Sequence, residues 1–185
     1  MERPHDGPTL LVFRHGTVQM TDESNGYEEI AASYIQVRGR AVNGIGASTV
    51  RAWAQTFSAG SVVLDLGCGT GIPVTKIVLE AGLQAYAIDA SPKMVEAFKQ
   101  NFPDLPVACE SVLRSGFFNQ AFDRIIAVGL MFLLTEESQR TLIAKMAAAL
   151  KLKGKMLFTA PTAKHEWKDL MTGRLSWSLG MEQYR

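Results

Sequence analysis

The sequence contains few cysteines and almost no net charge. Cys68 and Cys109 are its two cysteines among 185 residues, so it has neither a disulfide framework nor the spacing of a zinc site. Its 19 Lys and Arg residues against 18 Asp and Glu residues leave a net charge of +1. The chain therefore lacks the excess of basic residues with which proteins bind nucleic-acid phosphates. We therefore expect a reducing, cytoplasmic compartment, no bound metal and no nucleic-acid partner.

The sequence also lacks long hydrophobic runs. The longest nearly unbroken one, residues 125–134, is half of the roughly 20 residues that a membrane-spanning helix needs. The first residues lack the apolar core and cleavage site of a signal peptide. With 47% hydrophobic residues the chain is nevertheless too apolar to be disordered. These features predict one globular domain that does not enter a membrane.

Helical periodicity begins after a lead-in, residues 1–26, that is rich in Pro, Gly, Asp and Ser and that we expect to be loosely ordered. Apolar residues then recur three and four positions apart, first from Tyr27 to Ile35 and again from Val50 to Phe57. The pattern predicts a helical cap over residues 27–58.

From residue 61 onward, short apolar runs alternate with helical segments. The runs predict strands over 61–66, 84–88, 106–110, 122–130 and 155–160, and the segments predict helices over 72–81, 93–101 and 135–152. Strands that alternate with helices form a mainly parallel, doubly wound sheet with helices on both faces. We expect one α/β domain over 27–185, with a core at 59–161 and a final segment at 162–185.

The most informative segment is a predicted strand that ends in three glycines, residues 62–71. A dinucleotide fingerprint needs a third glycine where Ile72 stands, and it has no use for the carboxylate of Asp65. A phosphate-binding P-loop needs a Lys-Ser/Thr pair after its last glycine, and Ile72-Pro73 replaces it. The turn thus favours a cofactor that carries positive charge and no phosphate.

Asp89 follows the next predicted strand, 24 residues after Asp65. A carboxylate at this place can accept hydrogen bonds from both hydroxyls of a ribose. Asp89 therefore indicates a nucleoside.

Together, residues 64–71 (LDLGCGTG) and 88–94 (IDASPKM) closely resemble class I S-adenosylmethionine-dependent methyltransferases, nearest to the small-molecule branch. The resemblance covers roughly residues 27–185. It implies a Rossmann-like fold and an in-line displacement, in which a small-molecule acceptor takes the methyl group of S-adenosylmethionine and S-adenosylhomocysteine leaves.

The resemblance also assigns roles around the cofactor. The turn residues Asp65, Gly67, Cys68 and Gly69 would line its methionine portion, Asp89 its ribose, and Ala90 and Met94 its adenine. Glu110, or else Ser111, would lie near the adenine amino group, and Val128 beside the transferable methyl. Tyr34 and Arg38 would close over the cofactor, with Arg38 pairing with its carboxylate. From the residues alone, Cys68, Met94 and Tyr34 could equally be core side chains.

Candidates for acceptor binding are fewer. His165 follows the last predicted strand and is a candidate base or substrate contact, and Trp167 with Met131 and Phe132 could form an apolar wall. The end of strand 122–130 lacks the Asn/Asp-Pro-Pro-Tyr/Phe sequence of nucleic-acid amino-methyltransferases, which favours a small organic acceptor.

Two other functions remain open at this stage. The chain could be a non-catalytic module that binds S-adenosylmethionine without turnover. Residues 10–16 (LLVFRHG) also resemble the start of histidine phosphatases, which would predict a phosphohistidine at His15. That chemistry needs a second catalytic histidine, and neither His5 nor His165 stands in a matching context.

The length of the chain bears on its completeness. Class I methyltransferases usually end in strands that complete a seven-stranded sheet, and those C-terminal strands are expected to be missing because only 24 residues follow Pro161. We expect little room for a last helix and none for two strands. Either the chain is part of a longer protein, or its sheet ends at five strands with an exposed edge that a second copy could cover.

Overall fold

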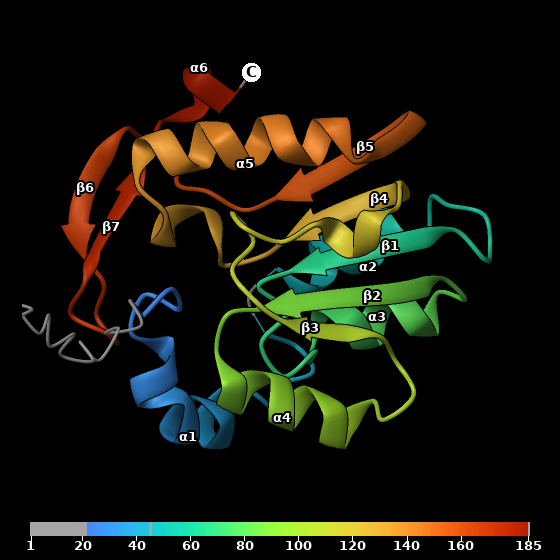
Figure 1. The fold of residues 1–185 in the computed structure, drawn as a ribbon, viewed down its shortest axis with the longest axis horizontal. Coiled ribbons are helices and arrows are strands. Elements are labelled where there is room, and N and C mark those ends of the chain that lie inside the picture. The colour runs from blue at the N-terminus through green and yellow to red at the C-terminus, as the bar shows by residue number, and fades with distance from the viewer. Residues whose placement is uncertain (1–21, 45, 185) are drawn as a thin grey trace, which may run out of the picture.

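The main sheet lies at the centre of the computed structural model, which describes residues 22–44 and 46–184. It has five parallel strands in the order β3-β2-β1-β4-β5 (Figure 1). The strands are β1 (Val62–Leu66), β2 (Gln84–Asp89), β3 (Val107–Cys109), β4 (Phe122–Ala127) and β5 (Leu150–Phe158). This arrangement confirms the predicted doubly wound, Rossmann-like sheet with N-terminal helices.

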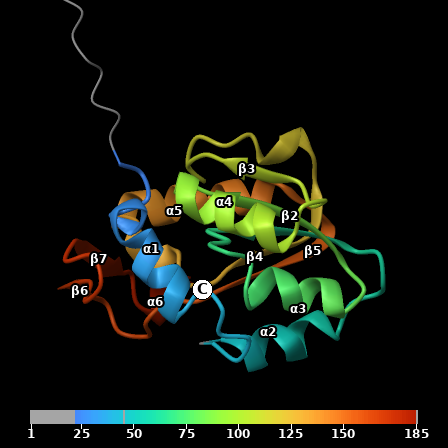
Figure 2. The same cartoon turned by 90° about the horizontal axis from the view of Figure 1, so that it is seen from below.

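Helices cover both faces of the sheet (Figures 1 and 2). They are α1 (Tyr27–Val37), α2 (Ala47–Ala54), α3 (Val74–Glu80), α4 (Pro92–Asn101), α5 (Glu136–Ala148) and the short α6 (Met181–Tyr184), with 3-10 turns η1 (Phe117–Asn119) and η2 (Met131–Leu133). Alternate residues of β1 point to opposite faces: Val63 packs against α2 and α3, whereas Leu64 packs on the side of α5. The strands are thus buried on both sides, as their apolar runs predict.

Two helix starts follow the capping rules. The Ser91 hydroxyl accepts a hydrogen bond from the Met94 N–H at 3.2 Å, and Pro92 is the first residue of α4. The Thr135 hydroxyl accepts from the Ser138 N–H at 3.3 Å and begins α5. Both starts lie within one residue of the starts predicted at 93 and 135.

The predicted end of the last long helix is wrong. The helix ends at Ala148, and Leu150 already pairs with Phe122 of β4. Gly154, two residues past the predicted helix end at 152, lies inside β5 beside Lys153, whose φ of +63° accompanies a shift in the β4–β5 register. The glycine therefore accommodates an irregular strand rather than a helix end.

Residues 162–184 contain more structure than the sequence predicts. An antiparallel pair, β6 (His165–Lys168) with β7 (Leu175–Ser178), forms a separate two-stranded sheet, here called the hairpin. Two strands fit because each has four residues and neither joins the main sheet. Within the described residues the main sheet ends at β5, where Lys151, Lys153 and Lys155 are exposed.

A buried glutamine fastens the hairpin to the domain. Gln139 of α5 is fully buried, and its side-chain nitrogen donates to the carbonyls of Leu134 and Trp177 at 2.8 and 2.9 Å. Its side-chain oxygen accepts from the Tyr184 hydroxyl at 2.5 Å. The amide thus joins α5, β7 and α6.

We expect Gln139→Leu to lower the free energy of unfolding by about 2 kcal/mol, because it removes three hydrogen bonds and leaves their partners buried. Urea denaturation measures this loss. Thr141→Leu, two residues along on the exposed side of α5, is the control. Equal stability of the two variants would contradict the assigned role of the amide.

Residues 10–16, with His15, lie outside the described part of the chain. In the part that the structure describes, every helix is too short or too polar to cross a membrane.

Candidate functional site

A cavity of about 630 Å³ opens at the carboxyl ends of β1, β2, β4 and β5, where α1 and the hairpin stand beyond the strand ends (Figure 1). Open parallel sheets bind ligands at this edge, and the volume is within the usual range for ligand sites. Eleven of the twelve predicted cofactor residues line it, namely Tyr34, Arg38, Asp65, Gly67, Cys68, Gly69, Asp89, Ala90, Met94, Ser111 and Val128. Glu110 is not among the lining residues, and its backbone N–H donates to the Asp89 carbonyl.

Asp89 holds the glycine turn in place. One of its carboxylate oxygens accepts from the Gly69 N–H at 2.8 Å and the other from the Ser91 N–H at 2.9 Å. Gly69 has a φ of +55°, and a Cβ built on it would meet no atom within 4 Å. The turn therefore leaves open space directly beside the carboxylate, and burial raises the pKa of Asp89.

Asp65 is a second buried carboxyl in the cavity wall. One oxygen accepts a hydrogen bond from the Thr75 hydroxyl at 2.7 Å. Burial, together with the charge of Asp89, raises the pKa of Asp65 from 3.8 to about 7, although the Thr75 bond opposes the shift. Two buried carboxyls in one cavity favour a ligand that brings positive charge to them.

This pKa predicts an unusual pH dependence for the ligand-free protein. Between pH values near 3.8 and 7 the unfolded chain releases the Asp65 proton while the folded chain keeps it, so stability falls as the pH rises through this window. Asp65→Asn, which stays neutral, should remove about 2 kcal/mol of the stability difference between pH 5 and pH 8. Urea titrations at both pH values measure this difference, and an unchanged difference in the variant would contradict the assignment.

In the segment before α1, Glu23, Ser24 and Asn25 also line the cavity, and residues 23–26 form a turn within the lead-in that the sequence predicted to be loosely ordered. The Asp22 carboxylate accepts from the backbone N–H groups of Ser24 and Gly26 at 3.0 and 2.8 Å. The cluster Asp-Glu-Ser-Asn-Gly before an apolar periodicity is itself a helix-start signal, so the sequence did contain a pointer to this structure.

Charged contacts fasten the same segment and the start of α1 to three other parts of the fold. The Glu28 carboxylate accepts from the Ser91 hydroxyl at 2.5 Å and pairs with Lys93. Arg174, which follows the hairpin turn, pairs with Asp22 at 3.0 Å and with Glu29 at 2.9 Å. Glu23 pairs with Arg114, in the loop after β3.

Two tyrosines of α1 contact each other and line the cavity with Arg38. The rings of Tyr27 and Tyr34 meet edge to face at 5.6 Å. Burial raises the pKa of Tyr27 to about 12 and raises that of Tyr34 as well, so both phenols keep their protons at neutral pH. They are therefore hydrogen-bond donors in the cavity wall.

Of the four residues predicted to contact the acceptor, Phe132 lines the cavity, whereas Met131, His165 and Trp167 do not. Met131 is fully buried in the core beside α5. Trp167 of β6 packs against Phe132, which does line the cavity, with ring centroids 5.9 Å apart, and His165 stacks on Trp167 at 4.6 Å. The structure thus places Trp167 and His165 behind Phe132.

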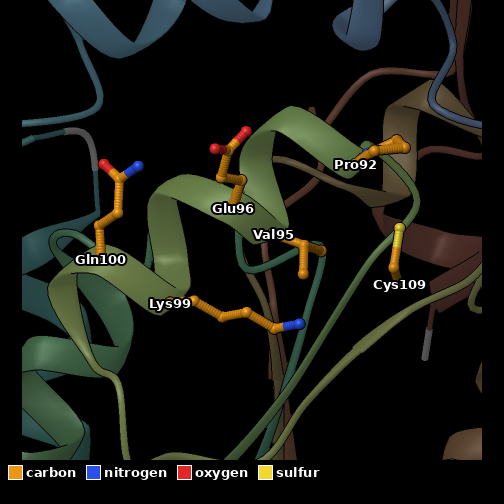
Figure 3. A pocket seen from close by; sticks show the side chains of 6 residues that line it. All are labelled: Pro92, Val95, Glu96, Lys99, Gln100 and Cys109. Carbon is orange, nitrogen blue, oxygen red and sulfur yellow. The ribbon is translucent and has the colours of Figure 1, made fainter.

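A second hollow, of about 490 Å³, lies between α4 and the end of β3 (Figure 3). Glu96 and Gln100 extend to one side of α4, whereas Val95 and Lys99 extend to the other. None of the predicted site residues lines this hollow. Its side chains do not converge on a common point, so the cavity at the strand ends is the candidate site.

Comparison with known proteins agrees with this geometry. Residues 63–154, which include both the glycine turn and Asp89, match the family described as methyltransferase domain. A protein of Anoxybacillus flavithermus named uncharacterized methyltransferase is 31% identical over 100 residues, which are 54% of this chain and 47% of that protein. The cypemycin N-terminal methyltransferase of Streptomyces is 33% identical over 95 residues, 51% of this chain and 38% of that enzyme. The aligned part of the chain is thus less than half the length of either relative.

Among solved structures, the N-methyltransferase NodS of Bradyrhizobium japonicum, in complex with S-adenosyl-L-homocysteine, superposes with a TM-score of 0.63. The match covers 74% of this chain and 72% of NodS at 18% sequence identity. At that identity the similarity establishes the fold.

Proposed function

The chain belongs to the class I S-adenosylmethionine-dependent methyltransferases, and we propose that it transfers a methyl group from S-adenosylmethionine to a small-molecule acceptor. The observation that carries the proposal is the cavity in which Asp65, the open glycine turn and Asp89 meet. The relatives named above are all named methyltransferases, and NodS is named an N-methyltransferase.

The residues of the cavity fit the cofactor chemically. When bound, S-adenosylmethionine supplies a methyl group on a positively charged sulfur, together with an ammonium, a carboxylate and a nucleoside. Asp65 is a buried carboxyl with one hydrogen-bond partner and suits the ammonium. The carboxylate of Asp89 suits the ribose hydroxyls, and the space beside Gly69 allows backbone contact with the ligand.

Other residues complete the proposed cofactor site. Arg38, the residue after the end of α1, is the cation for the cofactor carboxylate. Ala90 and Met94 provide apolar contact for the adenine, with Ser111 near its amino group. Val128 follows β4 and borders the reacting centre.

The protein contributes alignment and exclusion of water. A methyl group on a sulfonium is already activated, so the rate depends on holding the acceptor in line with it. Residues 23–25, Phe132 and Leu133 line the same cavity as the turn after β1, and they would shield the reacting atoms from solvent. His165, the candidate base from the sequence, stacks on Trp167 behind Phe132 and therefore does not face the acceptor for a proton transfer.

Calorimetric titration with S-adenosylmethionine and S-adenosylhomocysteine tests the proposal. We expect both ligands to bind in the micromolar range, and no binding at millimolar ligand would refute it. Incubation with methyl-labelled cofactor and a panel of small amines, phenols and thiols then separates an enzyme from a module that binds without turnover. Binding without transfer to any panel member would favour the module.

A further inference from the structure

The cavity has two chemically different ends. The end at β1 and β2 contains the turn, Asp65 and Asp89, which the proposed function assigns to the cofactor. The other end is formed by the residues that follow β4 and β5, on the far side of β1 in the sheet order. Since the cofactor fills the first end, the second is the place for an acceptor.

Uncharged side chains form the wall at the second end. Those that the structure places there are Leu130, Phe132, Leu133, Leu134, Ala160 and Pro161, with Thr159 between them. Glu23, an acidic residue that also lines the cavity, is paired with Arg114. A charged group buried here would find no compensating partner among the described wall residues, which costs several kcal/mol.

Two rings of the hairpin support the Phe132 side chain. The Trp167 ring packs against it and is in turn stacked with His165. Trp167 belongs to the hairpin, which Gln139 fastens to α5. A supported aromatic ring keeps its orientation when a ligand packs on it, so Phe132 offers a fixed apolar surface.

Thr159 is the polar exception in this wall. Its hydroxyl oxygen accepts a hydrogen bond from the Gly129 N–H at 2.8 Å, and no described residue accepts its hydrogen. A threonine hydroxyl both accepts and donates, so its proton is available to a ligand. The backbone bond fixes the position of the oxygen and thereby limits where that proton can point.

We propose that this end of the cavity binds an uncharged, largely apolar acceptor, with Phe132 as its packing surface and Thr159 as a hydrogen-bond donor to one of its oxygen atoms. This inference rests on the proposed function, because the cofactor must occupy the other end. It names Phe132 and Thr159 as specificity-determining residues and Trp167 as a positioning residue that acts through Phe132.

Fluorescent probes test the charge preference with saturating S-adenosylhomocysteine present. N-phenyl-1-naphthylamine is uncharged, and 8-anilinonaphthalene-1-sulfonate has the same rings with a sulfonate added. We expect the uncharged probe to bind at least about tenfold more tightly, and Phe132→Ala to weaken it by about tenfold. Equal binding of the two probes, or an unchanged affinity in Phe132→Ala, would overturn the inference.

Prodan, an uncharged naphthalene with a carbonyl, tests the hydrogen bond because its emission shifts to the red when a donor binds that oxygen. We expect a blue shift in Thr159→Val and native emission in Thr159→Ser, which keeps the hydroxyl. Identical spectra in all three proteins, or no binding of prodan, would overturn the role of Thr159. Calorimetry with S-adenosylhomocysteine accompanies each variant: unchanged affinity shows an intact cofactor end, whereas no binding by the native protein refutes the proposed function itself.

Discussion

Replacing Asp89 with alanine is expected to weaken S-adenosylhomocysteine binding by about a hundredfold or more. The carboxylate accepts the N–H groups of Gly69 and Ser91, and in the proposed complex it also accepts the two ribose hydroxyls. A hydrogen bond to a charged group contributes about 1.5–3 kcal/mol. Losing both ribose hydrogen bonds therefore costs more than the roughly 2.8 kcal/mol that corresponds to a hundredfold change in affinity. Calorimetric titration of both proteins measures the difference.

The chain offers a matched control for this variant. Glu110 follows the neighbouring strand β3, but its side chain is not part of the cavity wall, so Glu110→Ala should bind the ligand as the native protein does. Asp89→Asn keeps the size of the side chain and loses its charge, and we expect an intermediate affinity. If Asp89→Ala bound within threefold of the native protein while still unfolding cooperatively, the ribose assignment would be wrong.

Gly71→Ala should lower the free energy of unfolding by roughly 2–5 kcal/mol, the largest stability effect that we expect of a single methyl group in this turn. Gly71 has a φ of +78°, and a Cβ there would lie 2.5 Å from the Phe102 ring and 2.8 Å from the Phe98 ring. Phe98 is fully buried, so the rings cannot simply move into solvent.

Gly69→Ala provides the comparison, because Gly69 also has a positive φ but open space around it. It should cost only the left-handed strain of about 1–2 kcal/mol, while the added methyl group fills space that we assign to the cofactor. Urea denaturation and ligand titration of both variants should therefore separate the two glycines. Equal losses of stability would show that the contact with Phe98 and Phe102 is relieved at little cost.

The sequence predicts the sheet and the cofactor end of the cavity well because their signals are local. Ser91-Pro92 marks the start of α4 within two residues, and the glycine turn with Asp89 places two strand ends at one edge. The choice between Glu110 and Ser111 could not be made from sequence, because neighbouring residues at a strand end point to opposite sides. In the structure Ser111 lines the cavity.

The acceptor end is harder to predict because its contacts join distant segments. Trp167 was expected to meet the substrate, yet it packs behind Phe132, 35 positions earlier in the chain. Thr159 carries no sequence signal, since its role depends on where Gly129 presents its N–H. The two short strands of the hairpin were missed because four-residue strands bury little surface of their own, and Gln139 supplies part of their attachment.

Among the residues that the structure describes, no strand pairs with the outer edge of β5, and this bears on how copies of the chain behave at high concentration. Lys151, Lys153 and Lys155 are exposed along this strand, and Lys151 is paired with Asp123 at 2.9 Å. Two such edges brought together would set lysines against lysines, so strand addition between copies is electrostatically unfavourable. The lysines in this way protect the outer edge of β5 against sheet-to-sheet aggregation, and added salt, which screens their charges, weakens that protection.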